Sequence, residues 1–104
     1  MVAFNFEEAS QTLFCLFDGR MDTVNSKIAM EKFNAQLSEL PGNAEKLRIV
    51  IDLGTVDYVA SEFLRFSLSA AKCVQKGNFS IVNADPQVLK VFIIAGLVSI
   101  LKVS

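Results

Sequence analysis

The chain has 104 residues, with 10 Lys and Arg against 11 Asp and Glu, and a formal net charge of −1. This length predicts a single domain over residues 1–104. A hydrophobic fraction of 52% with 20% charged residues excludes a disordered tail. The near-zero charge, without a Lys/Arg cluster, argues against nucleic-acid binding. The chain has no His, which excludes Ser-His-Asp and Cys-His catalysis and every His-based metal site.

The two cysteines and the N-terminus indicate a cytoplasmic protein. Cys15 lies in an apolar strand-like run and Cys73 in a helix-like run, so both are interpreted as reduced packing residues. No basic stretch followed by an apolar run marks a signal peptide. The apolar segment 91–101 spans 11 residues, too few for a membrane helix of about 20 residues, so no membrane insertion is expected.

The first elements read as a hairpin followed by a helix. Val2, Phe4 and Phe6 alternate with less apolar residues, which predicts a strand with one buried face. Residues 8–11 read as a turn. The continuous apolar run 12–17 (TLFCLF) predicts a second, antiparallel strand that is covered on both sides.

The first helix is expected after a break at Asp18 and Gly19. Asp22 or Thr23 can cap it, because their side-chain oxygens accept backbone N–H bonds of the first turn. Residues 41–43 (PGN) are predicted to end it. Its apolar face is predicted to consist of Val24, Ile28, Phe33, Leu37 and Leu40.

The middle of the chain predicts a strand, a loop and a second helix. Residues 47–53 (LRIVIDL) are typical of a central strand, and residues 54–60 are expected to form a connecting loop. Ser61 is predicted to be the N-cap of the helix, which stops at Gly77. Glu62 then lies in the first turn, near the positive end of the helix dipole.

The last third predicts a strand, a third helix and a final strand. Residues 79–82 form the strand, and Asp85-Pro86 starts the helix with an acceptor at the cap and proline at the first helical position. Gly96 ends this helix, and residues 98–103 are predicted to form a last strand. The fold class is therefore α/β: strand–strand–helix–strand–helix–strand–helix–strand, with a mixed sheet of about five strands and three helices.

Three local patterns follow one another along the chain: residues 17–22 (FDGRMD), residues 49–53 (IVIDL) with Val56 and Tyr58, and residues 83–88 (NADPQV) followed by 95–97 (AGL). Together they resemble the STAS domains, the family named for sulfate transporters and anti-sigma factor antagonists. The resemblance covers nearly the whole chain. It implies a STAS-like fold and non-enzymatic bacterial signalling, in which the protein binds an anti-sigma factor of the ATPase-kinase type.

The resemblance also implies a switch at the start of the second helix. The family's loop reads Asp-Ser-Ser-Gly-Leu, and its second Ser is phosphorylated. The matching residues here are Ala60, Ser61, Glu62, Phe63 and Leu64. Glu62 has no hydroxyl, so the usual phosphoryl transfer to a serine cannot occur at this position. A glutamate carries about one charge where phosphoserine carries about −1.5 to −2, so Glu62 is a partial mimic of the modified state.

Each candidate residue has a structural alternative that the sequence leaves open. Glu62 can be simply a favourable first-turn carboxylate, and Ser61 can be an N-cap rather than a phosphoacceptor. Phe63, with Phe66, is either an exposed anchor for a partner or a core residue. Asp22 is either a partner contact or an N-cap.

The partner-binding residues predicted from the resemblance are Asp22, Tyr58, Ser61, Glu62 and Phe63. The expected partner is an anti-sigma factor or related ATPase-type kinase. The alternative is a transporter ATPase, to which the chain would be an accessory subunit. The sequence does not indicate the oligomeric state.

An enzyme is not expected. Asp22, Asp52, Asp57 and Glu62 could gather at one end of the sheet, where α/β folds place ligands. However, the chain has no His, no phosphate-binding Gly-rich loop and no metal-ligand spacing, so neither a metal nor a cofactor is predicted. Asp52 is interpreted as an acceptor that organises its loop, and Asp57 as solvated.

Overall fold

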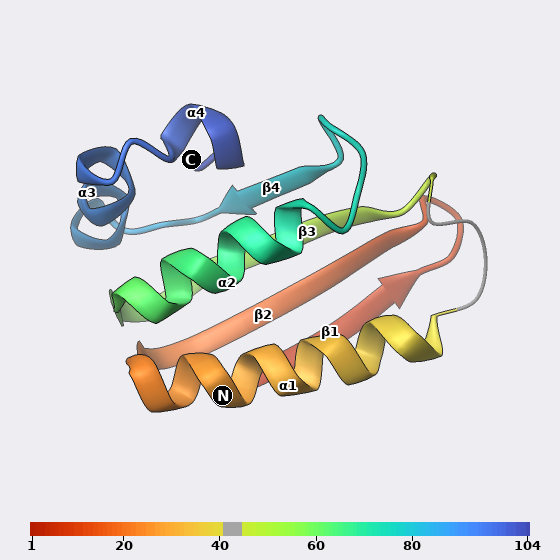
Figure 1. The fold of residues 1–104 in the computed structure, drawn as a ribbon, viewed down its shortest axis with the longest axis horizontal. Helices are drawn as coiled ribbons and strands as arrows, with labels where there is room; N and C mark the ends of the chain where they lie inside the picture. The colour runs from red at the N-terminus through yellow and green to blue at the C-terminus, as the bar shows by residue number, and fades with distance from the viewer. Residues whose placement is uncertain (41–44) are drawn as a thin grey trace.

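The fold is a twisted sheet with two long helices lying side by side across one face (Figure 1). The structure is a computed structural model, and it describes residues 1–40 and 45–104. The elements in chain order are β1 (Val2–Glu7), β2 (Thr12–Met21), α1 (Thr23–Glu39), β3 (Arg48–Val59), α2 (Ser61–Ala71), β4 (Phe79–Val82), α3 (Pro86–Ile94) and α4 (Val98–Leu101).

The sheet has the order β1-β2-β3-β4 and is mixed. β1 and β2 are antiparallel, with Phe4 opposite Cys15, and the other neighbours are parallel, with Cys15 opposite Ile51 and Ile51 opposite Ile81. A short turn allows the antiparallel hairpin, whereas each parallel pair needs a helical crossover. The predicted α/β class and the antiparallel start are confirmed.

Only one face of the central strands is fully buried. Leu13, Cys15, Ile49 and Ile51 have no exposed surface and form the core with the helices. Leu16, on the opposite face of β2, is 47% exposed. The prediction that the second strand is covered on both sides is therefore wrong. An apolar run shows that a strand is hydrophobic, but it does not show whether a second layer exists.

β2 and β3 both extend beyond their predicted ends. β2 continues through Asp18 and Gly19, with register shifts on either side of this pair, and Gly19 has φ +80, a backbone region that favours glycine. Residues 54–60 were predicted to be a loop, but β3 runs to Val59 because it pairs with this bulged end of β2. The predicted break and the predicted loop are both wrong.

α1 begins where predicted but presents a different face to the core. Ser26, Ala29 and Phe33 are buried, whereas Val24 and Ile28 are 66% and 45% exposed. The buried residues recur at helical spacing, and Val24 and Ile28 lie on the opposite side of that helix. The assignment of these two residues to the core is wrong. The predicted terminator at residues 41–43 lies outside the described residues.

α2 anchors an aromatic cluster in the core. The ring of Phe63 lies edge-on to Phe17, with 5.3 Å between centroids, and Phe66 makes a similar contact with Phe33 at 5.2 Å. Phe63 is 0% exposed and Phe66 is 1% exposed. The prediction of an exposed aromatic anchor at Phe63 is therefore wrong, and the core alternative is correct.

The C-terminal segment is helical where a strand was predicted. α3 starts as expected, because the Asp85 carboxylate accepts the Val88 N–H at 2.8 Å and Pro86 occupies the first turn. Residues 98–101 then form the short α4, and Val103 alone makes a parallel bridge to Ile81. Lys102, at φ +50, turns the chain out of the helix toward β4. The predicted strand over 98–103 is therefore wrong.

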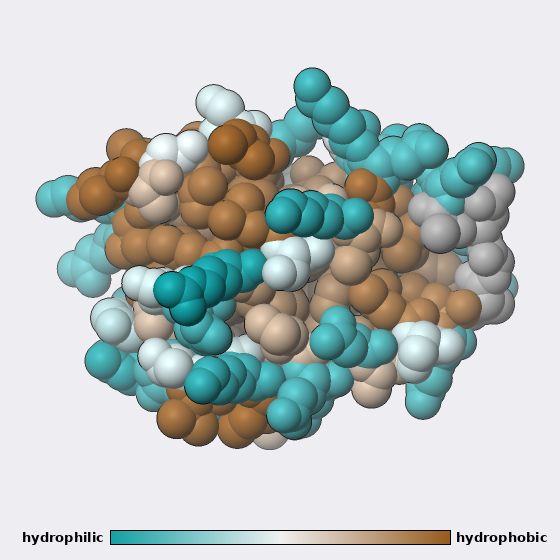
Figure 2. Space-filling view, viewed as in Figure 1, coloured by the Kyte–Doolittle hydropathy of each residue, from teal (hydrophilic) through white to brown (hydrophobic). Residues whose placement is uncertain are grey.

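The molecular surface is uneven in polarity. Figure 2 shows hydrophilic side chains across α1 and α2, and hydrophobic ones gathered over α3 and α4. This apolar area includes Ile93, Ile94 and Ile100, which are 57%, 76% and 68% exposed. Within residues 1–40 and 45–104, no helix has the length and apolar character needed to cross a membrane.

Candidate partner-binding site

The predicted site residues follow the ends of two neighbouring strands. Met21 ends β2 and pairs with Val59 at the end of β3. The Ala60 N–H then donates to the Met21 carbonyl at 2.9 Å. This bond holds the start of α2 beside the start of α1, so Asp22 and Ser61 emerge from the same end of the sheet (Figure 1).

Asp22 is the N-cap of α1. Its Oδ1 accepts the Asn25 N–H at 2.9 Å, and its carbonyl accepts the Ser26 N–H at 2.9 Å. The Asn25 side chain in turn donates to the Arg20 carbonyl at 2.8 Å, which ties the cap to the end of β2. The capping prediction is confirmed. Because Asp22 remains partly exposed, a contact with a partner is compatible with this geometry.

The start of α2 differs by one residue from the prediction. Ala60 is the N-cap, in an extended conformation and without a side-chain cap bond, and its carbonyl accepts the Phe63 N–H at 2.9 Å. Ser61 is therefore the first helical residue, and it is exposed. The prediction that Ser61 is the N-cap is wrong. The helix start therefore has no side-chain capping bond, and Ser61 is accessible next to Glu62.

Glu62 lies in the first turn of α2, as predicted, and forms an ion pair. Its Oε1 is 3.2 Å from Nη1 of Arg65, one helical turn later. The Glu62 side chain is 19% exposed, whereas that of Arg65 is 76% exposed. The carboxylate is thus partly covered, and both Arg65 and the helix N-terminus compensate its charge.

Tyr58 forms the edge of the site next to Arg20, which was not among the named partner-binding residues. The Arg20 guanidinium carbon is 3.9 Å from the centroid of the Tyr58 ring, a cation–π contact. The two residues are opposite each other in the β2–β3 register. Tyr58 is 40% exposed. Residues 55–59 were predicted to be loop. Assigning them to a strand paired with β2 would have placed Tyr58 beside Arg20.

Two exposed apolar side chains lie on α1 beyond the Asp22 cap. Val24 and Ile28 follow the Asp22 cap on the outer face of α1. Exposed aliphatic side chains next to a polar rim are typical of protein contact surfaces. Phe63 does not contribute, because it is buried. The residues at or next to the two strand ends, namely Arg20, Asp22, Tyr58, Ser61, Glu62 and Arg65, are called the strand-end surface below.

The candidate carboxylates do not converge into a reaction centre. Asp52 accepts the Gly54 N–H at 2.8 Å and the Asn83 side-chain amide at 3.1 Å, whereas Glu62 pairs with Arg65. Asp57 is exposed. Across the described part of the chain, no three Cys, Asp or Glu side chains come together as metal ligands. The interpretation of Asp52 as a loop-organising acceptor agrees with its contacts.

No family model matches the chain. One curated relative does: it is the protein named "Putative anti-sigma factor antagonist BtrV" of Bordetella bronchiseptica. The two sequences are 37% identical over 83 residues, which cover 78% of this chain and 70% of the relative.

The fold is shared with solved structures that include an anti-sigma factor antagonist and an anion transporter. The unphosphorylated anti-sigma factor antagonist SpoIIAA matches with a TM-score of 0.62 over 88% of this chain and 81% of its own, at 12% identity. The murine anion transporter Slc26a9 matches with a TM-score of 0.65 at 18% identity, over 89% of this chain but 15% of its own. The sequence match and the fold together show that this chain belongs to the anti-sigma factor antagonist family of STAS proteins.

Proposed function

We propose that the chain is a non-enzymatic, cytoplasmic anti-sigma factor antagonist that binds an ATPase-type kinase through the strand-end surface. The observation that carries the proposal is the Ala60–Met21 hydrogen bond at 2.9 Å, which holds the two helix starts side by side. The family match to a relative at 37% identity supports an anti-sigma factor as the partner. In this proposal Asp22, Tyr58 and Ser61 contact the kinase directly, and Val24 and Ile28 supply apolar area.

The proposal includes a role for Glu62. A glutamate has no hydroxyl and cannot form a serine phosphate ester, so the usual modification does not take place at this position. The Arg65 guanidinium at 3.2 Å compensates the Glu62 charge, and this supports a surface closer to the unmodified state than to a phosphorylated one. The antagonist would then bind its kinase constitutively. Phe63 supports the same surface from below by packing against Phe17.

The first experiment is capture by the immobilised full chain from a lysate of the source bacterium, with identification by mass spectrometry. We expect enrichment of an ATPase-type anti-sigma kinase, weakened by Tyr58→Ala. Glu8→Ala is the matched control, because Glu8 is exposed in the turn at the opposite end of the sheet. Capture of a transporter ATPase instead would overturn the proposal and favour an accessory-subunit role.

A double-mutant cycle tests the role of the ion pair. If Arg65 compensates Glu62, Arg65→Gln should weaken kinase binding in the wild-type background, because it leaves an uncompensated negative charge. In a Glu62→Gln background the same change should have little effect. Equal losses in both backgrounds would show that Arg65 acts as a direct contact and not through Glu62.

Ser61 is the remaining hydroxyl next to the switch position. We propose that it contacts the partner without being phosphorylated. Incubation of the chain with its kinase and ATP, followed by peptide mass spectrometry, should find Ser61 unmodified. Stoichiometric phosphate on Ser61 would instead show that the switch has moved by one residue.

A further inference from the structure

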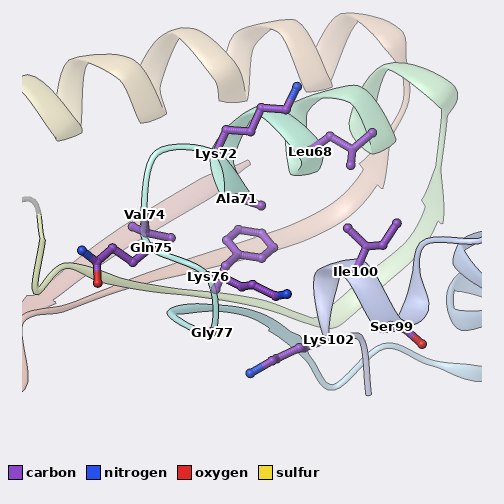
Figure 3. A pocket seen from close by; sticks show the side chains of 11 residues that line it. Leu68, Ala71, Lys72, Val74, Gln75, Lys76, Gly77, Ser99, Ile100 and Lys102 are labelled. Atoms are coloured by element: carbon purple, nitrogen blue, oxygen red, sulfur yellow. The ribbon is translucent and has the colours of Figure 1, made fainter.

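A cavity lies at the other end of α2 from the strand-end surface. It has a volume of about 430 Å³, within the range of roughly 300–1,000 Å³ that is usual for small-molecule sites. Figure 3 shows it between the end of α2, the segment leading to β4, and the C-terminal helix α4. α2 has 11 residues, so about 16 Å of helix separates its two ends.

The floor and walls of this cavity are apolar. Leu68 and Ala71 come from α2, Phe79 opens β4, and Ile100 extends from α4. Phe79 is 6% exposed and therefore belongs to the floor, whereas Ile100 is 68% exposed and stands at the mouth. Such a lining favours a hydrocarbon group, because covering it removes apolar surface from water.

The opening carries positive charge. Lys72, Lys76 and Lys102 all line the cavity, and Figure 3 shows their side chains around it. A Cβ placed on Gly77 would lie 3.8 Å from the Lys102 Nζ, so this ammonium group sits over the segment that precedes β4. Among the described residues, no acidic side chain forms an ion pair with any of the three lysines.

The part of the chain that forms the cavity carries a net positive charge. Residues 63–104 contain five Lys or Arg residues and a single acid, Asp85, although the complete chain has a net charge of −1. Asp85 is occupied in capping α3 and does not line the cavity. The cavity therefore combines an apolar interior with a rim of uncompensated cations.

We propose that this cavity binds a single-chain anionic amphiphile of the fatty-carboxylate class. The alkyl chain lies against Leu68, Phe79 and Ile100, and the carboxylate is held by Lys76 and Lys102. Charge complementarity favours an anion over a neutral lipid, and the volume of about 430 Å³ favours one alkyl chain over an extended protein contact. Because the cavity lies at the far end of α2, the ligand and a kinase can bind together.

The test is titration of the full chain with fatty carboxylates below their micelle concentration, followed by calorimetry and amide NMR. Octanoate and dodecanoate should bind with amide shifts centred on Gly77 and Ser99, and affinity should rise about fourfold per buried methylene until the cavity is filled. Dodecanol, with the same chain and no charge, should bind much more weakly. No kinase is present, so failure of this proposal is distinguishable from failure of the proposed function.

Two matched pairs of variants locate the site. Lys76→Glu should weaken dodecanoate binding by about fivefold or more, whereas Lys90→Glu, which changes an exposed lysine of α3 outside the cavity, should not. Ile100→Ser should weaken binding, whereas Ile94→Ser, at a similarly exposed isoleucine outside the cavity, should not.

Three results would overturn the proposal. Equal affinities for dodecanol and dodecanoate would show that the lysines do not contribute to binding. Binding of inorganic phosphate with the same affinity as dodecanoate would indicate a plain anion site. Binding of an acidic peptide such as hexaglutamate, with no binding of dodecanoate, would indicate a protein-docking surface.

Discussion

The two cysteines have different surroundings and should react differently. Cys15 is fully buried, and burial raises its pKa to about 12, whereas Cys73 is exposed and its pKa is raised less strongly, also by burial. Because the thiolate is the reactive form, we expect an aromatic disulfide reagent at pH 8 to modify Cys73 slowly and Cys15 only after unfolding. The measurement is a thiol count before and after guanidinium. Two rapidly reacting thiols in the native protein would contradict it.

Cys15 also predicts a dependence of stability on pH. Its folded pKa is above its unfolded value of 9.0, so the unfolded chain loses this proton first as pH rises. The free energy of unfolding should therefore fall between pH 9 and 12, by up to about 1.4 kcal/mol per pH unit from this group. Denaturant unfolding of Cys15→Ala beside wild type isolates the effect, since other groups contribute equally to both. Parallel curves would show that Cys15 makes no contribution.

Asp22 combines a cap with a proposed contact, and two substitutions separate them. Asp22→Ala removes the bond to the Asn25 N–H and should cost about 1 kcal/mol of stability. Asp22→Asn keeps a good cap and removes the charge, so it should leave stability nearly unchanged and weaken kinase capture. Thermal unfolding and capture are measured on both variants. Unchanged capture by Asp22→Asn would restrict Asp22 to its structural role.

At the scale of elements, α2 is held in place by its first aromatic residue. Phe63 is fully buried against Phe17 and Phe66, so Phe63→Ala should destabilise the protein by about 3–5 kcal/mol through the cavity it leaves. Phe63→Leu should cost less, because it keeps most of the volume. Urea unfolding measures both. Phe63→Gly, which introduces the residue of the family's loop, should destabilise the protein at least as much as Phe63→Ala. An unchanged free energy of unfolding would contradict the packing described.

The sequence predicted elements well where a local signal was specific. Asp85-Pro86 predicted the start of α3, and Asp22 predicted that of α1, because each combines a capping oxygen with a helical pattern. The strand predicted for residues 98–103 was wrong, since a short apolar run does not distinguish a strand from a buried helix. The predicted ends of β2 and β3 were also wrong. Each strand extends because it pairs with the other, and this pairing is a tertiary effect that the local sequence does not show.

The candidate site could also be predicted only in part, because local sequence places residues along the chain but not across the sheet. Ser61 and Glu62 were placed at the start of α2 by local sequence, and their position in the fold followed from the helix itself. Arg20 and Arg65 were not named as partner-binding residues and Val24 was assigned to the core, because their positions depend on strand register and on which side of a helix faces solvent. Phe63 was misassigned as an anchor, since only packing shows that α2 turns this residue inward.

At the scale of the whole molecule, stability should be highest in the two central strands. β2 pairs with β1 and β3, and β3 pairs with β2 and β4, whereas β1 and β4 each have one long neighbour. Amide hydrogen exchange should therefore be slowest in residues 13–17 and 49–53 and faster in α4. Exchange of α4 as slowly as β3 would contradict this order. The single-domain prediction for residues 1–104 would be supported by one cooperative transition.

The contact between Arg20 and Tyr58 gives the protein an optical reporter. The chain has no Trp and one Tyr, so all of its intrinsic near-ultraviolet emission from these residues comes from Tyr58. That ring is 40% exposed and lies under a guanidinium at the end of the sheet where the kinase is proposed to dock. The protein can therefore signal events at that surface without a label, while ligands in the cavity beyond α2 should leave its emission unchanged.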